Sequence, residues 1–180
     1  MYFNVKLTLY YKMKNIILVS LLGLFISCAD QNNVTKISSN GFIEGTGQSV
    51  SLGSEESIEV FKAIDKAWLE RDYYTLKTLI SDGGNYIHDD NSVSTNADEF
   101  ISKIEASFEE TKEKNEEWGW TTNFAFSVKP TKSETGDYPN EIGEWVNARF
   151  TAVNGDVYEE WYQISEGKLI SWSSAKRENK

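Results

Sequence analysis

The sequence is poor in the residues that build covalent and metal-based sites. It contains one cysteine, one histidine and two prolines in 180 residues. A single cysteine excludes an intrachain disulfide, and one histidine with one cysteine cannot supply the ligands of a zinc site. The sequence also has no glycine-rich phosphate loop and no nucleophile-elbow motif. We therefore expect no metal and no other cofactor.

Basic residues are scarce as well. The chain has 18 Lys and Arg against 28 Asp and Glu, which gives a net charge of -10. The first 27 residues contain three lysines and no acid, so the rest of the chain carries about -13. An acidic body repels phosphate backbones and anionic headgroups, which argues against a nucleic-acid partner and against charge-driven membrane binding.

Long hydrophobic runs are few, and the one at residues 16–26 is too short to span a bilayer. It follows the basic start Met13-Lys14 and ends in Phe25-Ile26-Ser27-Cys28. Its length fits the apolar region of a secretory signal. The ending resembles the lipobox of bacterial lipoproteins, in which the cysteine receives the lipid and becomes the mature N-terminus. The alternative is an ordinary buried cysteine in an N-terminal helix.

The resemblance implies that residues 1–27 are a signal peptide, with Met13 as a possible true start, and that Cys28 is lipidated. Acylation with two or more chains would anchor the protein firmly in the lipid bilayer. Ala29 rather than Asp follows the cysteine, which by the sorting pattern of such lipoproteins favours the outer membrane of a Gram-negative cell envelope. The periplasmic or external side stays open.

Residues 28–54 are rich in Ser, Asn, Gln, Gly and Thr, which predicts a flexible polar tether. The alternative is an extra N-terminal strand supported by Phe42 and Ile43. Beyond the tether, Ser54, Asp72 and Asn96 are N-cap candidates for three helices. The first is expected to end near residue 70, and a short strand at residues 85–88 separates the second helix from the third.

A strand over residues 118–128 is the strongest single pattern. Large side chains alternate with small or polar ones, which is typical of a strand with one buried face. Further strands are expected at residues 145–153, 156–165 and 168–175. Asn154-Gly155 and Glu166-Gly167 mark two-residue hairpin turns between them. The buried face of the first strand is predicted to carry Trp118, Trp120, Thr122, Phe124, Phe126 and Val128.

Two segments resemble the NTF2-like, or SnoaL-like, superfamily: AWLERDYYTLKTLISDGGNYIHDDNSVSTNADEFISKI and ISEGKLISWS. The resemblance covers residues 55–177. It implies an α+β fold in which three N-terminal helices pack in a curved antiparallel sheet, forming a cone with an open pocket. Many members dimerise through the outer sheet face. Members include isomerases, dehydratases, cyclases and binding domains, so the fold does not specify the chemistry.

The turns also predict the two faces of the sheet. Arg149 is expected opposite Glu160, and Trp161 opposite both Ala148 and Trp172. The predicted concave face holds Val146, Ala148, Phe150, Ala152, Val157, Glu159, Trp161, Gln163, Ile170 and Trp172. The opposite face is expected to hold Trp145, Asn147, Arg149, Thr151, Tyr158, Glu160, Tyr162 and Ile164. A bulge would exchange the faces for all residues beyond it.

His88, Asp89 and Asp90 are the catalytic candidates. The resemblance implies a general base near the end of the first short strand, and a histidine beside acids can take a proton near neutral pH. The alternative is an ordinary polar surface turn. Tyr86 lies on the same side of that strand as His88.

Glu159 is a second acid–base candidate, because burial beside Trp161 would raise its pKa; the alternative is a solvated position at the rim. Arg149 is interpreted as the cross-strand ion-pair partner of Glu160. The alternative is that Arg149 lies in the pocket and binds an anionic ligand. Four rings are expected to line a ligand pocket, although they can equally fill the core: Trp120, Phe124, Trp161 and Trp172.

The sequence thus predicts a membrane-anchored lipoprotein whose domain binds a small apolar or aromatic ligand without turnover. One alternative is an isomerase or dehydratase that uses His88, Asp89 or Asp90 as the base. Another is an interaction module that forms a homodimer through the outer sheet face.

Overall fold

The structure is a computed structural model and describes residues 41–43, 48–131 and 143–180. The predicted signal peptide and the predicted lipidation site, Cys28, lie outside the described residues. The described residues belong to one compact unit. Its elements are β1 (Gly41–Ile43), β2 (Gln48–Leu52), α2 (Glu55–Glu70), α3 (Tyr73–Leu79), β3 (Ile80–Ile87), β4 (Val93–Ser94), α4 (Ala97–Glu113), β5 (Trp120–Pro130), β6 (Glu144–Ala152), β7 (Val157–Ser165) and β8 (Lys168–Arg177).

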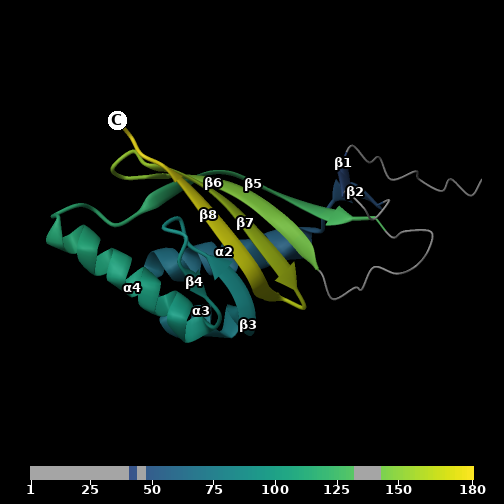
Figure 1. The fold of residues 1–180 in the computed structure, drawn as a ribbon, viewed down its shortest axis with the longest axis horizontal. Coiled ribbons are helices and arrows are strands. Elements are labelled where there is room, and N and C mark those ends of the chain that lie inside the picture. Colours follow the sequence, from purple (N-terminus) through teal and green to yellow (C-terminus); the bar gives the residue numbers. More distant parts are fainter. Residues whose placement is uncertain (1–40, 44–47, 132–142) are drawn as a thin grey trace, which may run out of the picture. The chain divides into compact units, whose positions relative to one another are not determined.

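The strands form one eight-stranded sheet in the order β1-β2-β5-β6-β7-β8-β3-β4. The helices lie on one side of the long strands β5 to β8 (Figure 1). The predicted α+β cone is therefore observed. The sheet is mixed rather than wholly antiparallel, because β3 runs parallel to β8. In the described part of the chain, no helix is long and apolar enough to cross a membrane.

The three predicted helix starts are confirmed. The side chains of Ser54, Asp72 and Asn96 each accept a hydrogen bond from a backbone N–H three residues later. Such caps satisfy donors that the first helical turn leaves unpaired. The first helix ends at Glu70, and Arg71 follows in the left-handed conformation.

The tether prediction is wrong for residues 41–43 and 48–52, which are the strands β1 and β2. The alternative of an added N-terminal strand is the observed one. β2 pairs with the end of β5, where Leu52 lies opposite Val128. Gly53 N–H extends this pairing by donating to the Ser127 carbonyl at 2.9 Å. Backbone hydrogen bonds do not depend on apolar side chains, so the polar composition of this segment concealed its strands.

A bulge in β5 changes which of its side chains are buried. The ladder to β6 skips Asn123: Thr122 lies opposite Phe150, and Phe124 opposite Arg149. Trp120 and Thr122 therefore point inward as predicted, whereas Phe124 and Phe126 lie on the outer face. An extra residue in one strand reverses the alternation beyond it.

The loop between β6 and β7 has three residues instead of the predicted two. Ala152 N–H donates to Asp156 O, Gly155 N–H donates to Ala152 O, and Gly155 has a φ of 88°. This is a type I turn followed by a left-handed residue. The added loop residue shifts β7 by one position, so Arg149 lies opposite Glu159 and Ala148 opposite Glu160.

The faces predicted for β7 are consequently wrong. Tyr158, Glu160, Tyr162 and Ile164 point inward, while Glu159 and Trp161 point outward. The two-residue turn at Glu166-Gly167 is confirmed, and a bulge then shifts the register again, so that Tyr162 lies opposite Trp172. This second shift keeps Trp172 on the inner face, as predicted.

The core lies between the inner face of the sheet and the helices. Phe61 and Ile64 of α2 and Phe100 and Ile104 of α4 are fully or almost fully buried. Their sheet-side partners include Val146, Ala148, Phe150, Tyr162, Ile164, Leu169 and Trp172.

Candidate functional site

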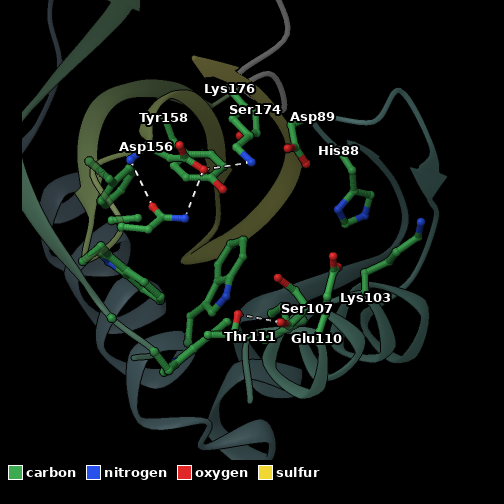
Figure 2. A pocket seen from close by; sticks show the side chains of 18 of the residues that line it. His88, Asp89, Lys103, Ser107, Glu110, Thr111, Asp156, Tyr158, Ser174 and Lys176 are labelled. Carbon is green, nitrogen blue, oxygen red and sulfur yellow. Dashed lines mark hydrogen bonds and ion pairs between the residues drawn. The ribbon is translucent and has the colours of Figure 1, made fainter. Parts of the chain in front are cut away.

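A cavity of about 470 Å³ opens between the helices and the inner face of the sheet. Figure 2 shows Ser107, Glu110 and Thr111 on one wall and Tyr158 and Ser174 across from them. The first group comes from α4 and the second from β7 and β8. The cavity is thus formed at one end of the cone, where α4 faces the last two strands.

Aromatic side chains form the inner part of this cavity. The indole of Trp68 packs edge-on against Trp120 and tilted against Trp172, with ring centroids 6.2 and 5.6 Å apart. These contacts fix the rings before any ligand arrives, which lowers the entropic cost of binding. The aromatic lining comprises Trp68, Trp118, Trp120, Phe150, Tyr158, Tyr162 and Trp172.

Glu160 is the most unusual residue in the cavity lining, because it carries a carboxyl group and yet is only 6% exposed. It accepts hydrogen bonds from the Tyr162 hydroxyl, from Trp172 Nε1 at 3.1 Å and from Ser174 Oγ at 3.0 Å. Burial raises its pKa to about 7, although the three donors oppose this effect. Glu160 can therefore exchange a proton near neutral pH.

A second carboxylate, Asp65, reaches the cavity from α2. Its two oxygens accept separate hydrogen bonds, from Trp120 Nε1 at 2.8 Å and from Thr122 Oγ1 at 2.9 Å. The residues before the β5 bulge thus orient the acid on the facing helix.

His88 lines the same cavity and is 8% exposed. Its Nε2 and the Ser94 hydroxyl share a hydrogen bond of 2.9 Å, and its ring lies 5.2 Å from that of Trp172. Burial, followed by the charge of Lys103, lowers the pKa of His88. The imidazole is therefore neutral at neutral pH and is held in place for proton transfer or ligand binding.

The lysines that line the cavity are all paired with acids. Lys103 contacts Asp90 at 3.2 Å and Lys114 contacts Glu110 at 2.7 Å. Lys176 contacts the largely buried Asp156 at 2.9 Å. Hydrogen bonds from Ser92 and then Lys103 hold the pKa of Asp90 well below its usual range. Asp90 is therefore an anion and a poor general base.

The structure brings five of the predicted site residues to the cavity lining: His88, Asp89, Asp90, Trp120 and Trp172. The other four lie elsewhere. Tyr86 is buried in the core, where its hydroxyl donates to the carbonyls of Ser81 and Leu169 at 2.6 and 3.0 Å. Phe124, Glu159 and Trp161 lie on the outer face.

Glu160, Tyr162 and Ser174 were missed as site residues by the sequence reasoning. A signal was present: Tyr158, Glu160, Tyr162 and Ile164 alternate as a set. The two-residue interpretation of the Asn154 turn assigned that set to the wrong face. A three-residue loop, with a type I turn followed by a left-handed glycine, would have placed Glu160 on the inner face of the sheet.

The outer face carries its own aromatic cluster, formed by Phe124, Phe126 and Trp161. These side chains are 40%, 44% and 42% exposed. Phe124 and Phe126 stack with centroids 6.0 Å apart, and Phe126 meets Trp161 edge-on. Arg149 lies 5.4 Å from the Phe124 ring and forms an ion pair with Glu159. We call this set the outer aromatic cluster.

Across residues 41–43, 48–131 and 143–180, no three His, Cys, Asp or Glu side chains converge in a way that could hold a metal ion.

The chain matches no family model and no curated protein, but solved structures share its fold. A SnoaL-like protein of unknown function from Burkholderia thailandensis aligns with a TM-score of 0.51 at 7% identity, over 71% of this chain and 98% of that one. A cystatin-like fold protein from Burkholderia xenovorans aligns with a TM-score of 0.50 at 11% identity, over 74% and 100%.

An NTF2-like protein of unknown function, also from B. xenovorans, gives a TM-score of 0.47 at 9% identity over 70% and 86% of the two chains. The first two alignments span almost the whole of the solved chains. This chain therefore shares the fold of the SnoaL-like protein and of the cystatin-like fold protein, in agreement with the resemblance of the two sequence segments.

Proposed function

We propose that this protein binds a small, largely apolar or aromatic ligand inside its cone, without turnover. The cavity carries this proposal: it has about 470 Å³ of space, mutually packed aromatic walls and a few oriented polar groups. Such a combination is typical of small-molecule sites, where apolar walls provide affinity and polar groups provide orientation.

Native mass spectrometry of the protein exported to a bacterial periplasm tests this proposal. The expected result is a bound small molecule at one copy per chain. Ser107→Trp, which fills the cavity from α4, should abolish that adduct. Ser102 is on the same helix but not in the lining of this cavity, so the control variant Ser102→Trp should retain the adduct. Equal adducts in both variants would overturn a cavity site.

We further propose that Cys28 is lipidated and anchors the domain in the bacterial cell envelope. The basic start, the short apolar run and Ser27-Cys28 support this proposal. The intact protein should carry acyl mass and partition with membranes, and Cys28→Ser should lose both properties. A Cys28→Ser protein that retains them would contradict the anchor.

An isomerase or dehydratase is the alternative that His88 favours, because this neutral imidazole lines the cavity beside Trp172. His88→Ala should then abolish turnover of a bound molecule. If the protein only binds, the same variant should weaken binding without changing the fate of the ligand.

A homodimer is the second alternative, and the outer aromatic cluster favours it. Three exposed rings on one sheet face form the kind of apolar patch that protein contacts cover. Sedimentation should then show a dimer that Trp161→Asp converts to a monomer. A monomer at all concentrations would remove this alternative.

A further inference from the structure

The charges that line the cavity are unbalanced. Eight carboxyl groups and three lysines line it, and each lysine is already paired with one acid: Lys103 with Asp90, Lys114 with Glu110 and Lys176 with Asp156. The remaining acids have no cationic partner among the described residues. A bound cation would relieve this excess of negative charge.

Glu160 is the acid for which a missing cation matters most. Its carboxyl group is buried and is oriented by Tyr162, Trp172 and Ser174. Three donors suit a carboxylate, yet no Lys or Arg of the described chain lies within ion-pair distance of it. The negative charge of Asp65 on the facing helix disfavours ionisation of Glu160 further. A buried carboxylate of this kind is strongly stabilised by a counter-ion.

The groups around Glu160 suit a cation that carries carbon substituents. The indole of Trp172 donates to the carboxyl group and also packs against Trp68, which in turn contacts Trp120. Aromatic faces attract ammonium groups, most strongly when both are shielded from water. A bare metal ion would instead need several oxygen ligands around it.

We propose that the cavity selects an organic ammonium ion, with the Glu160 carboxylate as its counter-ion and the tryptophan rings as its walls. This inference rests on the proposed function, since it names the chemical class of the ligand that the cavity binds.

Binding should depend on pH. A cation beside Glu160 favours its ionised form. At any pH at which Glu160 is protonated in the empty cavity, binding of the cation therefore releases a proton. The pKa of about 7 places this coupling near neutral pH. Affinity should therefore rise as the pH increases through that range and then level off.

Other titratable and charged groups line the same cavity from each surrounding element: Asp65 on α2; His88, Asp89 and Asp90 after β3; Lys103, Glu110 and Lys114 on and directly after α4; Glu116 and Glu117 before β5; Asp156 before β7; Tyr158 and Tyr162 on β7; and Lys176 on β8. Protonation of His88 would also disfavour a cation at low pH. A Glu160 variant is therefore required to assign the pH dependence to Glu160.

The test uses choline and its uncharged carbon isostere, in which a tert-butyl group replaces the trimethylammonium group. Titration calorimetry on the full-length protein should show choline binding about tenfold or more tightly than the isostere, which corresponds to about 1.4 kcal/mol. Two matched variants decide the role of the acid. Glu160→Gln should lose the preference for choline and its dependence on pH near 7, and Glu159→Gln, one residue away on the outer face, should keep both.

Each other outcome overturns a defined part of the inference. If the isostere binds as tightly as choline, the cavity binds small molecules but does not select cations. If neither probe binds, the ammonium inference fails; a ligand found by native mass spectrometry would then still support the proposed function. If Glu160→Gln binds choline like the parent protein, Glu160 is not the counter-ion.

Discussion

Glu159 and Glu160 are adjacent in β7, yet they lie in opposite environments. Glu159 is on the outer face, partly exposed to water, with Arg149 as its ion-pair partner. Glu160 is on the inner face, buried, and contacts only neutral hydrogen-bond donors. The alternation of a strand is enough to produce this difference. One residue of register therefore decides which carboxyl group belongs to the ligand cavity.

The largest expected effect comes from changing that register. Asn123 is the extra residue of the β5 bulge, so its deletion should restore regular alternation and leave both faces as they are, at a cost of about 1 kcal/mol. Deletion of Ala125 instead should exchange the faces of the following residues and prevent folding. Circular dichroism would show whether each variant folds, and urea unfolding would measure its free energy of unfolding. Equal behaviour would contradict the assigned bulge.

The next effect compares two tryptophans on opposite faces. Trp172→Ala should lower the free energy of unfolding by about 3–5 kcal/mol, because it empties a buried site between α2, α4 and the sheet. Trp161→Ala removes a half-exposed ring and should cost below about 1 kcal/mol. Urea unfolding provides both values. A larger loss at Trp161 that depended on protein concentration would support the homodimer.

A third comparison uses the pH dependence of stability. Between pH 4.5 and about 7, folded Glu160 keeps a proton that the unfolded chain has released. Rising pH therefore destabilises the folded state, and this contribution levels off above the folded pKa. The shift corresponds to about 3 kcal/mol.

Glu160→Gln should remove this contribution, so its advantage in stability over the parent protein should grow from acid to neutral pH. Glu159→Gln serves as the control and should leave the pH profile of the parent unchanged. Chemical unfolding at a series of pH values would show the difference. Parallel profiles for the parent and Glu160→Gln would contradict the raised pKa.

The smallest expected effect concerns the ion pair between Arg149 and Glu159 on the outer face. A double-mutant cycle with Arg149→Met and Glu159→Gln should give a coupling of at most about 0.5 kcal/mol, because both side chains are more than one third exposed and salt screens them. Added salt should reduce that value. A coupling of several kcal/mol would show that this part of the outer face is shielded from water, as in a dimer.

Sequence reasoning succeeded where structure is decided locally. The caps at Ser54, Asp72 and Asn96 depend on a side chain and a backbone group three residues apart, so the sequence contains the whole interaction. The resemblance of residues 55–177 to the NTF2-like proteins then predicted the α+β cone correctly.

The reasoning failed where one added residue has distant effects. The bulge at Asn123 and the three-residue loop at Asn154 depend on pairing with neighbouring strands, which the sequence does not display. Because the bulge was not foreseen, Phe124 was predicted on the inner face instead of the outer one. Because the three-residue loop was not foreseen, Glu159 and Trp161 were predicted on the inner face, and Glu160 was predicted on the outer face and so was not considered as a site residue. Trp172 lies at the cavity as predicted because the β7–β8 bulge reversed the earlier shift. His88 lies there too, because the short strand predicted from residue 85 begins beyond the irregular pairing of β3 with β8 between Ile80 and Asn85.

The parallel pairing of β3 with β8 has a consequence for how the protein folds. Ser171 Oγ donates to the Asn85 carbonyl across 86 residues of sequence. Ordering so long a loop is entropically costly, and chains dominated by distant contacts fold slowly. The helices and β3 are synthesised before β5 to β8, and until then β3 has only the two-residue strand β4 beside it. β3 joins the long strands only when the last of them, β8, is complete. Folding should therefore follow, rather than accompany, synthesis of the chain.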